Sequence, residues 1–257
     1  MSHTYSYPRP AVSVDCVLFG FQPDAADLQV LLIERADEPH KGAAALPGGF
    51  VEVDDGREQG EDLEAAARRE LLEETGVKVD YLEQLYTFGK PGRDPRGRVI
   101  TVAYIALVRS TDHAARAGSD AAGASWVSLR DARARAMAFD HREILETAVA
   151  RLRGKVRYAP LGFALLPERF TMPELLSLYE TILGAPLDRG NFRNAVLRLG
   201  VLKKVGQRKG HGAGRAPDLY QFDKRAYDRA MRDGISFDPV PDSKGPPRVA
   251  RAERKRR

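Results

Sequence analysis

The chain has 257 residues, 43% of them apolar, and a formal net charge of +5 at pH 7, which suits a globular protein with one large or two modest domains. No run of about eighteen apolar residues occurs, and the N-terminal MSHTYSYPRP lacks the apolar stretch of a signal peptide, so we expect a cytoplasmic protein without membrane contact. The single cysteine, Cys16, excludes a disulfide within one chain, and its apolar surroundings indicate a small buried residue.

Charge is distributed unevenly along the chain. Residues 1 to 154 hold 19 Lys and Arg against 25 Asp and Glu, whereas residues 155 to 257 hold 22 against 11. A basic half suggests a polyanionic partner, although a charged, solvated surface accounts for the same numbers.

In the acidic half, two runs rich in β-branched residues and leucine, VSVDCVLFGF and LQVLLIERA, flank the turn-forming PDAAD and predict paired strands. EDLEAAARRELLEETG predicts a helix that Gly76 ends. Further strands are predicted at VDYLEQLYTFG, RVITVAYIALVR and ASWVSL, an exposed turn at HAARAGSDAAGA, and a helix at REILETAVARLRG that Gly154 ends.

In the basic half, TMPELLSLYETILG predicts a helix with Thr171 as N-cap, Pro173 in the first turn and Gly184 beyond the end. LDRGNFRNAVLRLG predicts a second helix with Phe192, Val196 and Leu199 on its inner face. Two strands, VLKKVG and DLYQF, flank the basic, glycine-rich QRKGHGAGRAP. This order of two helices and a hairpin favours a winged helix-turn-helix domain.

The first predicted helix stacks three carboxylates, Glu70, Glu73 and Glu74, on one side. Side chains three and four residues apart are neighbours on a helix, and each like-charged pair costs about 0.2–0.5 kcal/mol. Oxygen ligands beside a glycine-rich loop suit a hard divalent cation, which would offset this repulsion. From the spacing alone, a solvated acidic face balanced by Arg68 and Arg69 is the alternative.

The stretches GGFVE and RRELLEETGV together resemble the signature of the Nudix hydrolase superfamily. Its positions are held, in order, by Gly49, Glu61, Arg69, Glu70, Leu71, Glu73, Glu74, Gly76 and Val77. The loop between Gly49 and Glu61 is longer than the family usually has, which bears on how the glycines meet a metal. The resemblance implies an α+β protein whose N-terminal Nudix domain is an α/β/α sandwich with a mixed sheet.

The resemblance also implies site residues. The metal, Mg²⁺ or Mn²⁺, would be held by three carboxylates that also serve catalysis: Glu70, Glu73 and Glu74. Arg69, grouped with them, would pair with Glu61 to fix the helix against the loop, and a carbonyl of Gly48 or Gly49 could complete the metal shell. The implied reaction is attack of water on a phosphorus of a nucleoside diphosphate derivative, with one of the last two carboxylates as a candidate base.

Longer phrases resemble Nudix-related transcriptional regulators of NAD or sugar metabolism, of the NrtR type; among them are LPGGFV, YLEQLYTFGKPGRDPRGRVITVAYIALV, AFDHREIL and LLPERFTMPELLSLYETILGAPLDRGNFRNAVLRLGVL. That resemblance covers nearly the whole chain and implies ADP-ribose or a related metabolite as ligand, double-stranded operator DNA as partner, and a homodimer. We expect a Nudix domain over residues 1–154, a winged helix over residues 155–232, and a basic, disordered tail over residues 233–257.

Candidate ligand-binding residues are two glycines and four arginines that could clamp phosphates or a ribose: Arg35, Gly48, Gly49, Arg93, Arg96 and Arg98. Relatives often carry Trp where this chain has Ala44, so a surface for stacking a base could be missing. His141, a lone histidine, is interpreted as a structural hydrogen-bonding residue.

Candidate DNA-binding residues fall in two groups. The second helix of a winged helix enters the major groove, and here it offers Arg189, Asn191, Arg193, Asn194 and Arg198. The wing contacts the backbone and here offers Arg208, Lys209, His211 and Arg215. The alternative for this domain is a protein contact with a basic surface.

Three functions follow from these expectations. The first is an ADP-ribose-responsive regulator that still hydrolyses its ligand. The second is an ADP-ribose or nucleotide-sugar pyrophosphatase whose winged helix serves only as a dimer or protein contact. The third is a repressor with a silent hydrolase site, which the intact acidic set disfavours.

Overall fold

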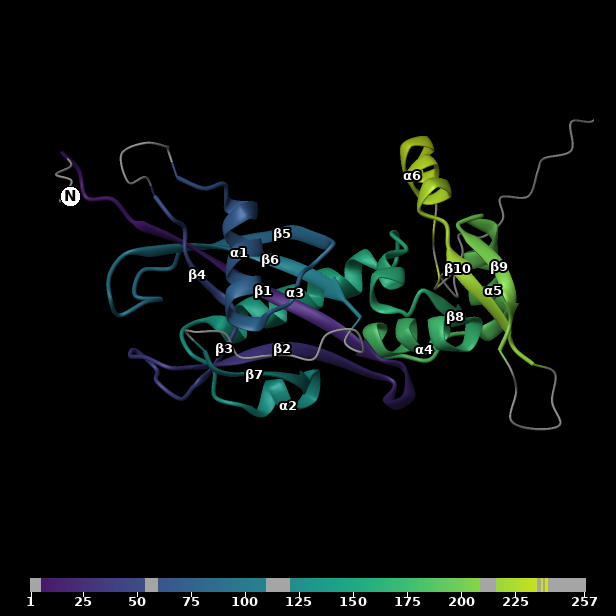
Figure 1. Cartoon of the computed structure of the whole chain (residues 1–257), viewed down its shortest axis with the longest axis horizontal. Helices are drawn as coiled ribbons and strands as arrows, with labels where there is room; N and C mark the ends of the chain where they lie inside the picture. The colour runs from purple at the N-terminus through teal and green to yellow at the C-terminus, as the bar shows by residue number, and fades with distance from the viewer. Residues whose placement is uncertain are drawn as a thin grey trace, which may run out of the picture.

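The computed structural model describes residues 6–53, 60–109, 121–208 and 216–234, together with residues 237 and 239. Figure 1 shows a larger N-terminal part built on one sheet and a smaller C-terminal part at the other end of the molecule. Among the described residues, no helix is long and apolar enough to cross a membrane.

Within the described ranges, the N-terminal sheet has seven strands in the order β3-β2-β1-β6-β5, with β4 paired to β1 and β7 paired to β2. The strands are β1 (Ala11–Gln22), β2 (Asp27–Arg35), β3 (Ala44–Ala45), β4 (Gly48–Phe50), β5 (Tyr81–Phe88), β6 (Val99–Val108) and β7 (Ala121–Ser128). β1 and β6 are parallel and the other pairs are antiparallel, so the predicted mixed sheet is confirmed.

Helices cover both faces of this sheet because successive side chains of β1 point in opposite directions. Cys16 and Leu18 pack with Ala67 and Leu71 of α1 (Leu63–Thr75). The other face, with Phe19, packs against α3 (His141–Lys155) and the short α2 (Leu129–Ala134). The α/β/α sandwich is therefore confirmed, and Cys16 is fully buried as predicted.

Tertiary contacts moved some boundaries away from the expected positions. α3 does not end at Gly154 but continues to Lys155, whose ammonium bonds Glu83 of β5, and the following Val156 is completely buried. β7 begins at Ala121, so the last four residues of the expected turn at 113–124 belong to a strand paired with β2. The rest of that turn lies outside the described residues.

The C-terminal part is a winged helix, as predicted. It contains η3 (Leu161–Leu165), β8 (Arg169–Thr171), α4 (Met172–Leu183), α5 (Arg189–Arg198), β9 (Leu202–Gln207), β10 (Asp218–Phe222) and α6 (Lys224–Asp233). Thr171 caps α4 in a reciprocal capping box with Glu174, and Gly184 ends the helix with a φ of 69°. β8 and α6 were not predicted, and the predicted tail lies almost entirely outside the described residues.

The two parts share one apolar core. Buried residues run without a break from the α3 face of the N-terminal sheet through η3 to α4 and α5. Hydrogen bonds reinforce the junction: Thr181 of α4 donates to the carbonyl of Ala26 at 3.1 Å, and Arg153 of α3 donates to the carbonyl of Ile182 at 3.0 Å. α4 therefore lies directly on the N-terminal part.

Candidate active site and nucleic-acid interface

α1 holds the acidic residues in a fixed orientation. Its N-cap Asp62 accepts a hydrogen bond from the amide of Glu64, and Gly76, with a φ of 70°, ends it by donating to the carbonyl of Leu72. Ala66 and Ala67 lie on the side of α1 that faces the sheet and are completely buried, and the thiol of Cys16 lies 3.7 Å from the carbonyl of Ala67. Small side chains thus bring α1 close to β1.

Arg69 lies at the centre of the acidic face. Its guanidinium bonds Glu61 at 2.6 Å, Glu70 at 2.8 Å and Glu73 at 3.0 Å. The predicted pairing of Arg69 with Glu61 is present, and this hydrogen bond holds the pKa of Glu61 below its ordinary value. Burial raises the pKa of Glu70, with Arg69 opposing. Arg69 therefore neutralises charge that the helix concentrates on one side.

The glycines predicted to line the site approach these carboxylates closely. A Cβ added to Gly49 would lie 2.3 Å from Oε1 of Glu70, and one added to Gly48 would lie 2.2 Å from the carbonyl of Val14. The amide of Gly48 also donates to Oε2 of Glu74 at 2.8 Å. Position 48 therefore requires glycine, because a Cβ there would clash with the backbone of β1, whereas a side chain at position 49 would displace the carboxylate of Glu70.

A small cleft of about 100 Å³ opens beside these glycines. Two rings and two arginines form its rim: the guanidinium carbon of Arg96 lies 5.0 Å from the centre of the Phe50 ring and 5.6 Å from that of Phe139, and Arg35 lies 4.9 Å from Phe139. Phe139 has a φ of 48°, uncommon for a side-chain-bearing residue. Neither ring was singled out from the sequence, because nothing local marks them.

Arg93 is the buried arginine of this cleft, with only 4% of its side chain exposed. It bonds Asp140 at 2.6 Å and Asp15 at 3.2 Å. Burial alone would lower the pKa of Arg93, but these two carboxylates outweigh it and raise that pKa. Arg93 therefore ties the β5–β6 loop to β1 and to the start of α3, with part of its surface lining the cleft.

His141 is a structural residue, as interpreted from the sequence. Its Nδ1 accepts a hydrogen bond from the amide of Leu46 at 2.9 Å, and its Nε2 lies 3.4 Å from Asp15. Burial lowers the pKa of His141, with Asp15 opposing. The neutral ring thus fixes the strand that leads into the glycines.

The four candidate arginines do not share one position. Arg35, Arg93 and Arg96 line the cleft, whereas Arg98 does not, and instead donates to the carbonyl of Gly89 at 2.6 Å. A larger hollow of about 450 Å³ adjoins the cleft, and Arg93 and Phe139 line both. The combined space is consistent with a ligand larger than the cleft alone would hold.

α5 presents the candidate major-groove residues. Phe192 and Val196 are buried against α4, as predicted, and Asp188 caps the helix by accepting from the amide of Asn191 at 2.7 Å. The opposite face is exposed and holds all five candidates: Arg189, Asn191, Arg193, Asn194 and Arg198. Among them only Arg193 has a side-chain partner in the described part of the chain, the Tyr220 hydroxyl at 3.5 Å.

The base of the wing is closed by the amide of Arg208, which donates to the carbonyl of Pro217 at 2.9 Å. The guanidinium of Arg208 is already engaged, because it bonds both carboxylate oxygens of Glu174 at 2.7 and 3.1 Å. Lys209, His211 and Arg215 lie outside the described residues.

Comparison with known proteins matches both parts of the chain. The NUDIX domain family matches residues 9–148, and the NrtR DNA-binding winged helix domain matches residues 162–222. The chain belongs to the Nudix superfamily. Its combination of two domains is that of the NrtR-type regulators.

Relatives of the NrtR type resemble the chain over both domains. The ADPR responsive transcriptional repressor NtrR of Acinetobacter baylyi is 40% identical over 222 residues, which cover 86% of each chain. The crystal structure of Shewanella oneidensis NrtR complexed with a 27mer DNA is 33% identical, covers 84% of this chain and 95% of that one, and has a TM-score of 0.71. An ADP-ribose pyrophosphatase of Methanocaldococcus jannaschii is 39% identical over 140 residues, covering 54% of this chain and 73% of its own.

The side chains of the Nudix motif are of the type that binds a divalent cation. Their donors are all carboxylate oxygens, which hard divalent cations prefer. However, the described residues contain no ready group of three or more acidic, His or Cys side chains arranged to hold a metal. The reason lies in Arg69, which draws Glu70 and Glu73 toward itself, while Glu74 turns to Gly48. The donor set therefore fits a cation once these side chains turn from their present partners.

Proposed function

We propose that this protein is an ADP-ribose-responsive transcriptional repressor that binds operator DNA through α5 and the wing, and that its Nudix domain also hydrolyses the ligand. One observation carries the proposal: the similarity to an ADPR responsive repressor extends over 86% of both chains and so includes both domains. The DNA-bound relative and the pyrophosphatase relative support the two activities separately.

The cleft beside Gly48 and Gly49 is the proposed ligand site. Arginine has planar, paired donors that suit phosphate oxygens, and Arg35 and Arg96 both line the cleft. Arg96 would exchange its present bonds to Asp94 for such a ligand. The rings of Phe50 and Phe139 already pack against guanidinium groups, and a base or ribose face could pack there in the same way. Ala44 does not line this cleft, so these two rings, and not position 44, would provide a stacking surface there.

The acidic face is the proposed metal site, with Glu70, Glu73 and Glu74 holding Mg²⁺ or Mn²⁺. A bound divalent cation supplies polarisation of a phosphoryl oxygen and a lowered pKa of water. Arg69 would position the carboxylates by keeping the helix against the loop through Glu61. The close contact of Gly49 with Glu70 would place the diphosphate beside them.

Hydrolysis is tested by release of AMP from ADP-ribose in the presence of Mg²⁺. Glu73→Gln and Glu74→Gln should each lower the rate by at least about a hundredfold, because each removes a charge from the proposed metal site. Glu64→Gln is the matched control, since Glu64 is on the same helix but pairs with Arg68. Unchanged rates in both variants would exclude the proposed site, and ADP-ribose binding would then be measured on its own by thermal shift.

DNA binding is tested on a duplex carrying the operator with the full chain. The double variant Arg193→Ala/Arg198→Ala should abolish operator binding while AMP release is retained. Arg130→Ala, exposed on α2 of the Nudix domain, is the matched control for loss of surface charge. If the double variant bound DNA as the unmodified protein does, the winged helix would be a protein contact and the pyrophosphatase alternative would stand.

Control by ligand requires that ADP-ribose prefer the DNA-free arrangement, because equal affinity for both arrangements shifts nothing. The shared core and the Thr181 and Arg153 hydrogen bonds offer a direct connection between the domains. Saturating ADP-ribose should therefore weaken operator affinity. A two-fold homodimer facing two half-sites is part of the proposal, and sedimentation of the complex would measure it.

A further inference from the structure

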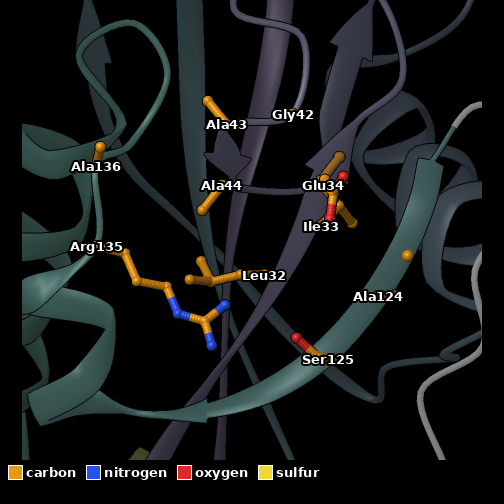
Figure 2. A pocket seen from close by; sticks show the side chains of 11 residues that line it. Leu32, Ile33, Glu34, Gly42, Ala43, Ala44, Ala124, Ser125, Arg135 and Ala136 are labelled. Atoms are coloured by element: carbon orange, nitrogen blue, oxygen red, sulfur yellow. The ribbon is translucent and has the colours of Figure 1, made fainter.

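A second hollow lies away from the proposed ligand cleft. Figure 2 shows it between β2, β3, β7 and the segment after α2. Its volume is about 380 Å³. Of the residues that the structure describes, only Ile33 lines both this hollow and the cleft. Its size falls within the range of about 300–1,000 Å³ that small-molecule sites occupy. We call it the Ala44 hollow.

The Ala44 hollow exists because its walls are made of small residues. Six of the eleven residues that line it are glycine or alanine: Gly42, Ala43, Ala44, Gly123, Ala124 and Ala136. Ala44 is half-buried in β3, where its backbone pairs with Glu34 and its carbonyl accepts from the amide of Ala138 at 2.9 Å. The backbone there is fixed on both sides, so the walls cannot collapse to fill the space that a large side chain would occupy.

Two charged groups border the hollow. In Figure 2 the guanidinium of Arg135 points toward Leu32. Glu34 lies farther along β2, on the side of Leu32 away from Arg135. The backbone of Arg135 is held as the C-cap of α2 and by a hydrogen bond that Arg142 donates to its carbonyl. Neither Arg135 nor Glu34 forms a side-chain ion pair with any described residue. Both groups are therefore available to a ligand.

These features select a chemical class. The small apolar side chains of Ala43, Ala44 and Ala124, with Leu32 buried beneath them, suit the flat face of a ring, and an aromatic ring buries on the order of 150–250 Å². A guanidinium binds carboxylate or phosphate through paired donors, so Arg135 selects an acidic group. The carboxylate of Glu34 accepts hydrogen bonds and so selects a ring N–H or amino group.

We propose that the Ala44 hollow is a second binding site, for a small planar nitrogen heterocycle that bears an acidic group, with Ala44 contacting the ring and Arg135 binding the acid. This site is separate from the proposed ADP-ribose site, because all of its described lining residues except Ile33 lie outside the cleft.

The test uses the full chain, with indole-3-acetate as the probe, and measures binding by calorimetry. The unmodified protein should bind with a Kd on the order of 1 mM or tighter. Ala44→Trp, which places an indole in the hollow, should weaken binding at least about tenfold. Arg135→Gln should weaken indole-3-acetate by roughly tenfold but leave indole, which has no acidic group, unchanged. Acetate alone should not bind.

Two further measurements make the outcome decisive. Saturating ADP-ribose should leave the affinity for indole-3-acetate unchanged, and displacement would overturn the proposal by placing the probe in the cleft. If Ala44→Trp did not fold, as judged by its thermal transition, Ala44→Leu takes its place. The proposal would also be overturned if the variant at position 44 bound indole-3-acetate as tightly as the unmodified protein, or if the unmodified protein did not bind it at all. ADP-ribose binding is measured in the same samples, so a failure of the proposed function is seen separately.

Discussion

α1 and α5 both present charged side chains, but they differ in how the chain itself engages them. On α1 a single arginine, Arg69, bonds the three carboxylates of Glu61, Glu70 and Glu73, and the carboxylate of Glu70 is partly buried. On α5 the inner face is apolar and buried, and the outer arginines and asparagines are exposed, with Arg193 alone among them bonding a described side chain, the Tyr220 hydroxyl. The comparison suggests that α5 can bind a partner without rearrangement, whereas α1 must exchange internal bonds for a ligand.

The largest effect is expected on the buried side of α5. Phe192 is completely buried, and its ring centre lies 5.1 Å from that of Tyr179 of α4. Phe192→Ala should lower the free energy of unfolding by about 3–5 kcal/mol, because it removes ring contacts and leaves a cavity. Asn191→Ala, its exposed neighbour, is the control and should stay within about 0.5 kcal/mol. Chemical denaturation measures both, and equal effects would contradict the assignment of faces.

A smaller but substantial effect is expected at Arg69. Arg69→Met should lower the free energy of unfolding by about 2–4 kcal/mol, since it leaves partly buried carboxylates without their partner. The control is Arg68→Met, whose side chain is 40% exposed and pairs with Glu64, and which should cost under about 1 kcal/mol. Added Mg²⁺ should restore part of the stability of Arg69→Met if the three carboxylates bind it. An identical melting midpoint with and without Mg²⁺ would count against the metal site.

Local patterns predicted much of this fold. The C-terminal glycine of α1, both caps of α4 and the inner face of α5 follow from residues close together in the chain, so the sequence was sufficient for them. The end of α3 was not predicted correctly, because a glycine favours termination only in the absence of stronger tertiary contacts. Those contacts come from Glu83 and from the buried Val156. β3 and β4 are too short to produce a recognisable alternation.

The candidate site was predictable only in part, for the same reason. The pair of Arg69 with Glu61 lies within one motif, and the structure contains it. Arg93 was expected to face a ligand, but its two carboxylate partners, Asp15 and Asp140, come from segments 78 and 47 residues away. No local pattern reports such contacts. The ring of Phe139 escaped notice for the same reason.

A moderate, pH-dependent effect is expected at His141. Burial lowers its pKa from the ordinary 6.5, although the carboxylates of Asp15 and Asp140 oppose this while the charge of Arg93 adds to it. The unfolded chain therefore binds a proton at a pH where the folded chain does not. The free energy of unfolding should fall as the pH drops below about 6.5, by at most about 1.4 kcal/mol per pH unit.

His141→Asn isolates this contribution. The amide oxygen of Asn can accept the bond from Leu46 in place of Nδ1, and it takes up no proton. The variant should show a flatter dependence of unfolding on pH between about 6.5 and 5.5. If urea denaturation gave the same dependence of the unfolding free energy on pH for the variant and the unmodified protein, groups other than His141 would produce that dependence.

The smallest effect compares an unpaired arginine with a paired one. Arg189 on α5 has no side-chain partner in the described part of the chain, whereas Arg208 bonds Glu174 of the capping box. Arg189→Gln should reduce the slope of log affinity against log salt by about 1 without changing stability. Arg208→Gln removes the same charge but also releases Glu174, so it should lower stability by about 0.5–1 kcal/mol as well. If the two variants changed stability equally, the bond between Arg208 and Glu174 would contribute nothing to stability. Arg208 would then behave like Arg189, and the contrast between arginines with and without a side-chain partner would not hold for the winged helix.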